Sequence, residues 1–163
     1  MKVLIKRILF VFTVTFLSLF TIPRAEPAMV ERSLAQLTQD ADLIVVGKVE
    51  SVTSQMLNGK IWSSATILVE SKIKGELEAG QGTVVVSFPG GKVGDIGMQV
   101  EDSPNYRKDE EVVAFLKKIQ GESHFLTVGS SQGKFITDQG IVPRENIPLE
   151  QFLARIESII TGP

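Results

Sequence analysis

Hydrophobic residues recur at every second position over much of the chain, and this period predicts strands. Residues 43–54 (LIVVGKVESVTS) are rich in the β-branched side chains that favour extended backbone. The first half of this stretch is apolar on both faces, so we expect both of its sides to be covered. Gly47 lies within it, where a glycine commonly marks a bulge or a tight bend.

A second strand is predicted at residues 60–73, directly after the hairpin turn signal Asn58-Gly59. Its apolar and polar positions alternate with the two-residue period of a half-buried strand. The predicted buried face carries Ile61, Ala65, Ile67, Val69 and Ile73, and the other face carries Ser64, Thr66, Glu70 and Lys72.

Four shorter strands are predicted farther along the chain, at residues 83–88, 111–119, 125–128 and 133–137. Residues 89–108, between the first two of these, begin with Pro89 and contain four glycines. Proline and closely spaced glycines interrupt regular structure, so we expect a flexible loop there.

A helix is predicted at each end of the strand-rich region. Residues 30–39 carry apolar side chains four and three positions apart, as on one face of a short helix. Residues 148–161 carry a longer amphipathic pattern, with Pro148 expected in the first turn and Asn146 or Ile147 as the cap. Its apolar face consists of Leu149, Phe152, Leu153, Ile156, Ile159 and Ile160.

Together these elements predict a mainly β fold. Five or six short strands with a helix at each end suit a small, partly open barrel covered by helices. The chain contains no internal repeat and no low-complexity tract. We therefore expect a single domain at residues 29–163 that includes the C-terminal helix.

The first 28 residues follow a different pattern. Three basic residues among the first seven precede an uncharged run at residues 8–22, and small residues follow it. This layout is typical of a signal peptide, expected at residues 1–28 with cleavage near Ala25 or Ala28. A helix of fifteen residues spans about 22 Å, short of the roughly 30 Å of a bilayer core. We expect export to the periplasm or the extracellular space, with an uncleaved anchor as the alternative.

Removing this segment changes the charge of the protein. The whole chain of 163 residues has a net charge of −2, but four of its 17 basic residues precede Ala25. The rest of the chain carries 13 basic and 19 acidic side chains, a net charge of about −6. That balance argues against nucleic-acid binding and against docking on an anionic membrane surface.

Few residues offer catalytic chemistry. There is no cysteine, which excludes disulfides, thiolate metal sites and thiol nucleophiles. The single histidine, His124, is expected as an ordinary exposed or edge-strand residue, because no G-x-S-x-G motif accompanies it and zinc sites need several ligands. The run Asp109-Glu110-Glu111 is expected in a solvated turn. The sequence therefore assigns no catalytic residue, no metal ligand and no cofactor.

One acidic pair lies within the glycine-rich loop. Glu101 and Asp102, with Asp95 nearby, offer oxygen ligands that suit calcium. They lack the alternating acidic pattern of a calcium-binding loop, so calcium stays a minor alternative.

The loop at residues 89–108 is the strongest candidate for a binding surface. Its PGGKxG start lacks the spacing of a phosphate-binding loop. We expect instead that the glycines are there because several positions of the loop have a positive φ. Long loops on rigid scaffolds nevertheless often carry function. Trp62 is expected either under the C-terminal helix, which we favour, or exposed as a binding anchor. The candidate binding residues are Trp62, Pro89, Gly90, Gly91, Lys92, Gly94, Met98 and Tyr106.

Residues 41–137 resemble a domain of uncharacterised secreted bacterial proteins. The matching pieces are ADLIVVGKVESV (41–52), KG (74–75), FPGG (88–91), GMQV (97–100), EEVVAFL (110–116) and QGKF (132–135). More remotely, the order is similar to the netrin-like domain of tissue inhibitors of metalloproteinases. That resemblance implies an OB-like barrel of five to six strands with flanking helices. The inhibitors place an N-terminal cysteine on the protease zinc, and this chain has no cysteine, so no inhibitor residue maps onto it.

The sequence therefore predicts an exported, non-enzymatic binding module. We expect it to bind an extracytoplasmic protein or another extracellular ligand through residues 89–108 and Trp62. A protease-inhibitor-like domain and a carboxylate-based hydrolase are the alternatives, and the oligomeric state stays open.

Overall fold

The computed structural model describes residues 30–78 and 80–162. The predicted signal peptide at residues 1–28, with both candidate cleavage sites, lies outside the described residues. Contacts divide the chain into Met1–Val30 and Glu31–Pro163, and the second unit contains the strands and helices described below. No helix in the described part of the chain is long and apolar enough to cross a membrane.

A long hairpin forms the largest part of the sheet. Strands β1 (Leu43–Leu57) and β2 (Lys60–Lys74) pair antiparallel over almost their whole length. The turn residues Asn58 and Gly59 both have positive φ, 51° and 76°, which is the backbone geometry of a tight hairpin turn. The predicted turn is therefore confirmed, and both strands extend beyond their predicted ends.

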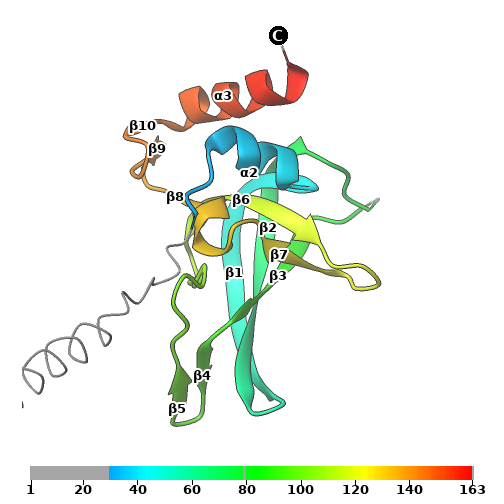
Figure 1. Cartoon of the computed structure of the whole chain (residues 1–163), viewed down its shortest axis with the longest axis vertical. Coiled ribbons are helices and arrows are strands. Elements are labelled where there is room, and N and C mark those ends of the chain that lie inside the picture. The colour runs from blue at the N-terminus through cyan, green and yellow to red at the C-terminus, as the bar shows by residue number, and fades with distance from the viewer. Residues whose placement is uncertain (1–29, 79, 163) are drawn as a thin grey trace, which may run out of the picture. The chain divides into compact units, whose positions relative to one another are not determined.

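The strands form a ring (Figure 1). Antiparallel pairs join β1 to β2, β2 to β3 (Thr83–Pro89), β7 (His124–Thr127) to β6 (Glu111–Lys118), and β6 back to β1. Strands β3 and β7 run parallel and pair only through Val85–His124 and Val86–Phe125, so the barrel is partly open. A sixth strand, β8 (Lys134–Thr137), pairs antiparallel with β6.

This architecture confirms the predicted fold class. It is mainly β, a small, partly open OB-like barrel with a short N-terminal helix and a C-terminal helix. The two helices are α2 (Leu34–Asp40) and α3 (Leu149–Thr161).

Residues 89–108 are not simply a flexible loop, which corrects the sequence expectation. They contain a second hairpin, β4 (Gly91–Val93) and β5 (Ile96–Met98), which we call the arm. The arm runs beside the β1–β2 hairpin and contacts both of its strands (Figure 1). Strands of three residues are too short to show a period in the sequence, which explains why the pattern missed them.

The first half of β1 is buried on both faces, as its sequence predicts. Leu43 and Val45 belong to the cluster inside the barrel, whereas Ile44 and Val46 belong to a second cluster beneath the helices. Gly47 follows them at an irregularity in the β1–β2 register, and a Cβ there would lie 2.1 Å from the carbonyl oxygen of Leu68. The register irregularity therefore confirms the expected bulge at Gly47, and the close backbone approach leaves no room for a side chain there.

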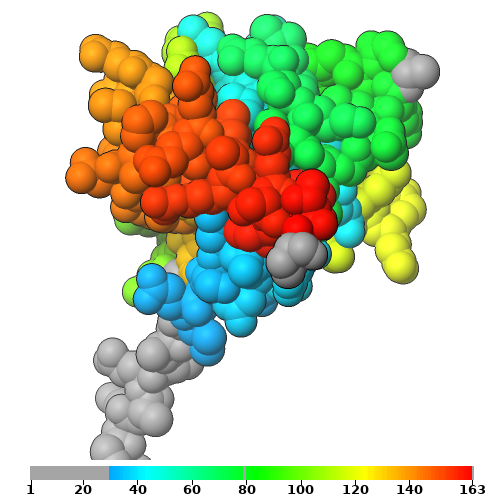
Figure 2. Space-filling view, turned by 90° about the horizontal axis from the view of Figure 1, so that it is seen from above, coloured from blue at the N-terminus to red at the C-terminus, as the bar shows by residue number. Residues whose placement is uncertain are grey.

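Helix α3 covers one end of the barrel, with α2 alongside it (Figure 2). Three tilted aromatic rings connect this layer to the sheet: Phe115 and Phe135 lie 5.4 Å apart, and Phe135 and Phe152 lie 4.6 Å apart between centroids. The N-cap of α3 is Pro148, so the expectation of Asn146 or Ile147 as cap is wrong. Three short elements precede the helix: η1 (Ser130–Gly133), β9 (Ile141–Val142) and β10 (Ile147–Pro148).

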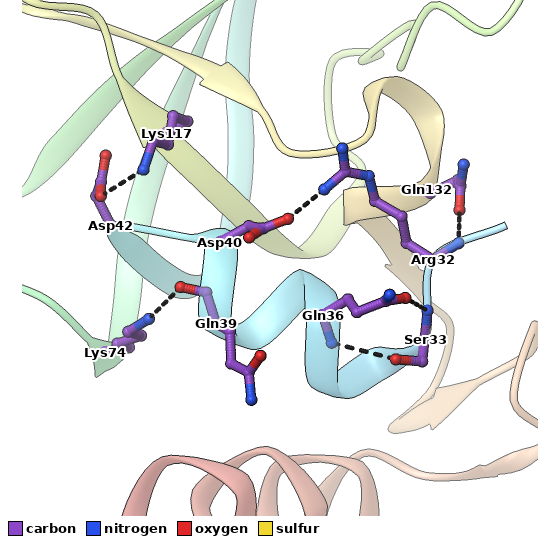
Figure 3. A network of polar contacts seen from close by, with 9 residues as sticks. All are labelled: Arg32, Ser33, Gln36, Gln39, Asp40, Asp42, Lys74, Lys117 and Gln132. Atoms are coloured by element: carbon purple, nitrogen blue, oxygen red, sulfur yellow. Dashed lines mark hydrogen bonds and ion pairs between the residues drawn. The ribbon is translucent and has the colours of Figure 1, made fainter. Parts of the chain in front are cut away.

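Helix α2 begins later than predicted because Ser33 caps it. The Ser33 side chain accepts from the backbone N–H of Gln36, and the Gln36 side chain accepts from the Ser33 N–H. At the other end, Lys74 Nζ donates to the carbonyl oxygen of Gln39 at 3.3 Å (Figure 3). An ion pair between Arg32 and Asp40 spans the helix. The capping box and the ion pair stabilise this helix of seven residues, and the Lys74 bond attaches it to β2.

Asp42 fixes the junction between α2 and the sheet. It accepts from the Lys118 backbone N–H at 2.9 Å and pairs with Lys117 Nζ at 3.0 Å (Figure 3). The Lys118 N–H lowers the pKa of Asp42 most strongly, partial burial opposes it, and Lys117 lowers it further. The carboxylate therefore stays ionised at neutral pH.

We predict that Phe135→Ala strongly destabilises the fold. Phe135 is 2% exposed, and its ring packs against two other rings and under the guanidinium of Arg144. Removing it should reduce the free energy of unfolding by about 3–5 kcal/mol. Urea unfolding followed by circular dichroism measures this change. The adjacent Ile136→Ala is the control, because Ile136 is 45% exposed, and equal losses for the two variants would contradict the prediction.

Candidate functional site

A groove of about 480 Å³ lies between the arm and the barrel. Strands β1 and β2 contribute Ser54 and Ser63 to it, and Phe88 comes from the end of β3. Val52 of β1 also lines the groove, and the arm and the segment that follows it supply the rest of the lining. The groove thus brings together five strands, β1 to β5, and the segment that follows β5.

The backbone of the arm is seated directly on the β1–β2 hairpin. The Ser63 hydroxyl donates to the carbonyl oxygen of Gly90 at 2.6 Å, and the Ser54 hydroxyl lies 2.7 Å from Ser63 Oγ. A Cβ on Gly91 would lie 2.2 Å from Ser63 Oγ and 2.6 Å from Ser54 Oγ. Gly91 also has a φ of 128°, so only glycine fits this seat.

Further bonds hold both ends of the arm. The backbone N–H of Gly90 donates to the carbonyl oxygen of Ile61 at 2.8 Å. On the returning segment, the Ser103 hydroxyl donates to the carbonyl oxygen of Pro89 at 2.7 Å. The arm therefore has a defined position against the barrel, and the groove beside it is already formed.

Tyr106 forms the floor of the groove. It is buried, its ring packs against Phe88 at 5.6 Å between centroids, and its hydroxyl lies 2.9 Å from Thr127 Oγ1. Burial raises the pKa of Tyr106 well above its ordinary value, although the hydrogen bond with Thr127 opposes the shift. Tyr106 is thus a neutral, structural phenol rather than an exposed contact residue.

A buried ion pair lies behind this floor. Lys134 Nζ is 2.5 Å from Glu110 Oε2, 3.1 Å from the carbonyl oxygen of Asn105 and 4.8 Å from the centre of the Tyr106 ring. The side chains of Lys134 and Glu110 are only 6% and 15% exposed. Burial lowers the pKa of Lys134, and Glu110 opposes that shift. The expectation that the whole run 109–111 is solvated is therefore wrong for Glu110.

The structure brings half of the predicted binding residues together. Gly91, Lys92, Met98 and Tyr106 line the groove. Pro89 and Gly90 lie behind it and accept hydrogen bonds through their carbonyl groups. Gly94 lies in the exposed turn of the arm. The groove therefore uses both ends of the arm rather than its tip.

Trp62 does not belong to this groove. It is half-buried on β2 and precedes Ser63, and successive side chains of a strand point to opposite faces. The expected cover by the C-terminal helix is also wrong. The cluster under α3 includes Ile73, at the other end of β2, and does not include Trp62. Trp62 and the arm are therefore not one surface.

Several lining residues were missed in the sequence. Ser63 carried a usable signal, because it interrupts the apolar face between Ile61 and Ala65. Ser54 then pairs with it across the hairpin. Gln99 and Arg107 carried no local signal, because only the path of the chain after the arm brings them to the groove.

The single histidine makes one contact that the sequence did not suggest. His124 Nδ1 lies 3.3 Å from Ser87 Oγ, because β7 runs parallel to β3. A hydrolase triad also needs a carboxylate that orients the histidine. Among the residues the structure describes, no acidic partner of His124 is recorded, and no group of three or more His, Asp or Glu side chains forms a metal site.

Comparison with known proteins adds no relative. No protein-family model matches the chain, and no curated protein shows significant similarity to it.

We predict that Glu110→Gln destabilises the protein in a pH-dependent way. Without its partner, the Lys134 charge is buried alone, which should cost about 2–4 kcal/mol at pH 7. Because burial lowers the pKa of Lys134, the unfolded chain binds more protons and stability rises as the pH approaches about 10.5.

The deficit of the Glu110→Gln variant relative to the wild type should therefore be smaller at pH 9.5 than at pH 7. Urea unfolding at both pH values measures it. Glu111→Gln, at the adjacent exposed position, is the control and should change little. A deficit of the same size at both pH values would contradict the role given to Lys134.

Proposed function

We propose that this protein is an exported, non-enzymatic binding module whose groove holds a segment of an extracytoplasmic partner protein. The observation that carries the proposal is the braced arm. Hydrogen bonds from Ser63 and Ser103 fix it against the barrel, so the groove exists before any ligand arrives. A preformed site avoids the entropic cost of ordering a loop on binding.

The lining of the groove supports binding rather than catalysis. Among the described residues it consists of apolar, hydroxyl, amide and cationic side chains and the neutral Tyr106. These groups suit packing and hydrogen bonding, whereas proton transfer near pH 7 mostly uses His, Asp or Glu. The hydroxyl of Ser63 is already engaged with Gly90, which also removes it as a candidate nucleophile.

Export is part of the same proposal. Its support is the charged start, the uncharged run at residues 8–22 and the small residues after it. The protease-inhibitor alternative depends on the netrin-like resemblance alone, and the cysteine that those inhibitors use does not occur in this chain.

We predict that filling the groove abolishes partner binding. Gln99 is exposed and lines the groove, so Gln99→Trp should block it without removing a buried contact. Wild-type protein is used as bait in extract of the native envelope and medium, and bound proteins are identified by mass spectrometry. We expect a partner that the Gln99→Trp bait loses by at least tenfold.

Gln151→Trp is the matched control, because Gln151 is exposed on α3. Its bait should retain the partner like the wild type. Equal capture by the Gln99→Trp bait would rule out the groove as the binding site. A wild-type bait that retains nothing beyond empty resin would contradict the proposed function as a whole.

We predict that residues 1–28 export a fused reporter. Alkaline phosphatase folds with its disulfides only outside the cytoplasm, so a fusion to this segment should be active in intact cells. Phe12→Asp places a charge inside the uncharged run and should reduce that activity by at least tenfold. Full activity of the Phe12→Asp fusion, or none with the unaltered segment, would contradict export by this route.

A further inference from the structure

The groove is positively charged in a protein that is otherwise acidic. The chain after Ala25 has a net charge of about −6, yet the charged residues lining the groove are Lys92 and Arg107. Neither has an ion-pair partner recorded among the described residues. Many other cations do have one, namely Arg32, Lys48, Lys72, Lys117, Lys134 and Arg144.

Glu110, which is largely buried near Arg107, does not neutralise the positive charge of the groove. Glu110 Oε2 already binds Lys134 Nζ at 2.5 Å and accepts from the backbone N–H of Arg107 at 2.9 Å. Burial lowers the pKa of Lys134, and the nearby charge of Arg107 lowers it further. Positive charge at this end of the groove is therefore left for a ligand to neutralise.

The rest of the lining favours a peptide. Val52 and Met98 give an apolar wall, and a methionine thioether adapts to side chains of different shape. Sugars stack on exposed aromatic rings, but the two rings of the groove, Phe88 and Tyr106, are 3% and 4% exposed. Nucleic acid is disfavoured because two cations in an acidic protein neutralise few phosphates.

We propose that the groove binds an acidic peptide segment of the partner protein. Carboxylates of that segment bind Lys92 and Arg107, and neighbouring apolar side chains pack against Val52 and Met98. The exposed amide of Gln99 is available to the peptide backbone. This inference rests on the proposed function and specifies the chemistry of its ligand.

The test uses two fluorescein-labelled pools of random octapeptides on immobilised protein. One pool is built from Leu, Val, Ser and Glu, and the other has Gln in place of Glu. We expect at least tenfold more of the Glu pool to be retained at 50 mM NaCl, with the difference reduced at 300 mM because salt screens the charges. Equal retention of the two pools would overturn the proposal.

Charge-removing variants locate the site. Lys92→Gln and Arg107→Gln should each reduce retention of the Glu pool about fivefold to tenfold. Lys60→Gln and Lys108→Gln remove exposed cations that do not line the groove, and they should change retention less than twofold. All four positions are exposed, and unchanged circular dichroism confirms folding. Equal effects at all four positions would show attraction to the surface in general and overturn the proposal.

Two further measurements distinguish failure of the peptide proposal from failure of the proposed function. Labelled oligogalacturonate is an acidic sugar, and binding of this probe without binding of the Glu pool would overturn the peptide proposal. The peptide proposal would also be overturned if the Gln99→Trp bait lost the captured partner but the Lys92→Gln and Arg107→Gln baits kept it. In that case the proposed function would stand. Capture unaffected by Gln99→Trp would instead remove the proposed function.

Discussion

Burial of both faces of the first half of β1 is the constraint on which the rest of the structure depends. Leu43 and Val45 need an apolar interior on one side, and Ile44 and Val46 need cover on the other. The strand ring satisfies the first requirement, and α2 and α3 satisfy the second. Once the helices occupy that end, the other half of the β1–β2 hairpin extends away from them, and the arm packs there (Figure 1).

The groove arises where the apolar inner face of this hairpin gives way to serine. Buried hydroxyl groups need hydrogen-bond partners, and Ser63 finds its partners in Ser54 and in the backbone of Gly90. The same bonds that satisfy these hydroxyls position the arm. Among the described residues, no buried polar side-chain atom is without a partner. The bonds that satisfy the buried hydroxyl of Ser63 therefore also set the shape of the groove.

Electrostatics connect this network to the proposed ligand. Glu110 and Lys134 neutralise each other beneath Tyr106, in a site where an unpaired charge would be costly. Because Glu110 pairs with Lys134, it forms no ion pair with Arg107, and both Arg107 and Lys92 line the groove without an ion-pair partner among the described residues. The buried pair thus supports the floor of the groove and leaves its rim positive.

The sequence by itself determined the elements with a repeated local pattern. The period-two alternation of β1 and β2, the Asn58-Gly59 turn and the amphipathic face of α3 are encoded by neighbouring residues, and the structure has them at nearly the expected positions. Only the tertiary structure decided that the arm is a hairpin, that Trp62 lies away from it, and that Glu110 meets Lys134. Those features depend on contacts between residues far apart in the chain, and such contacts leave no periodic signal in the residues that make them.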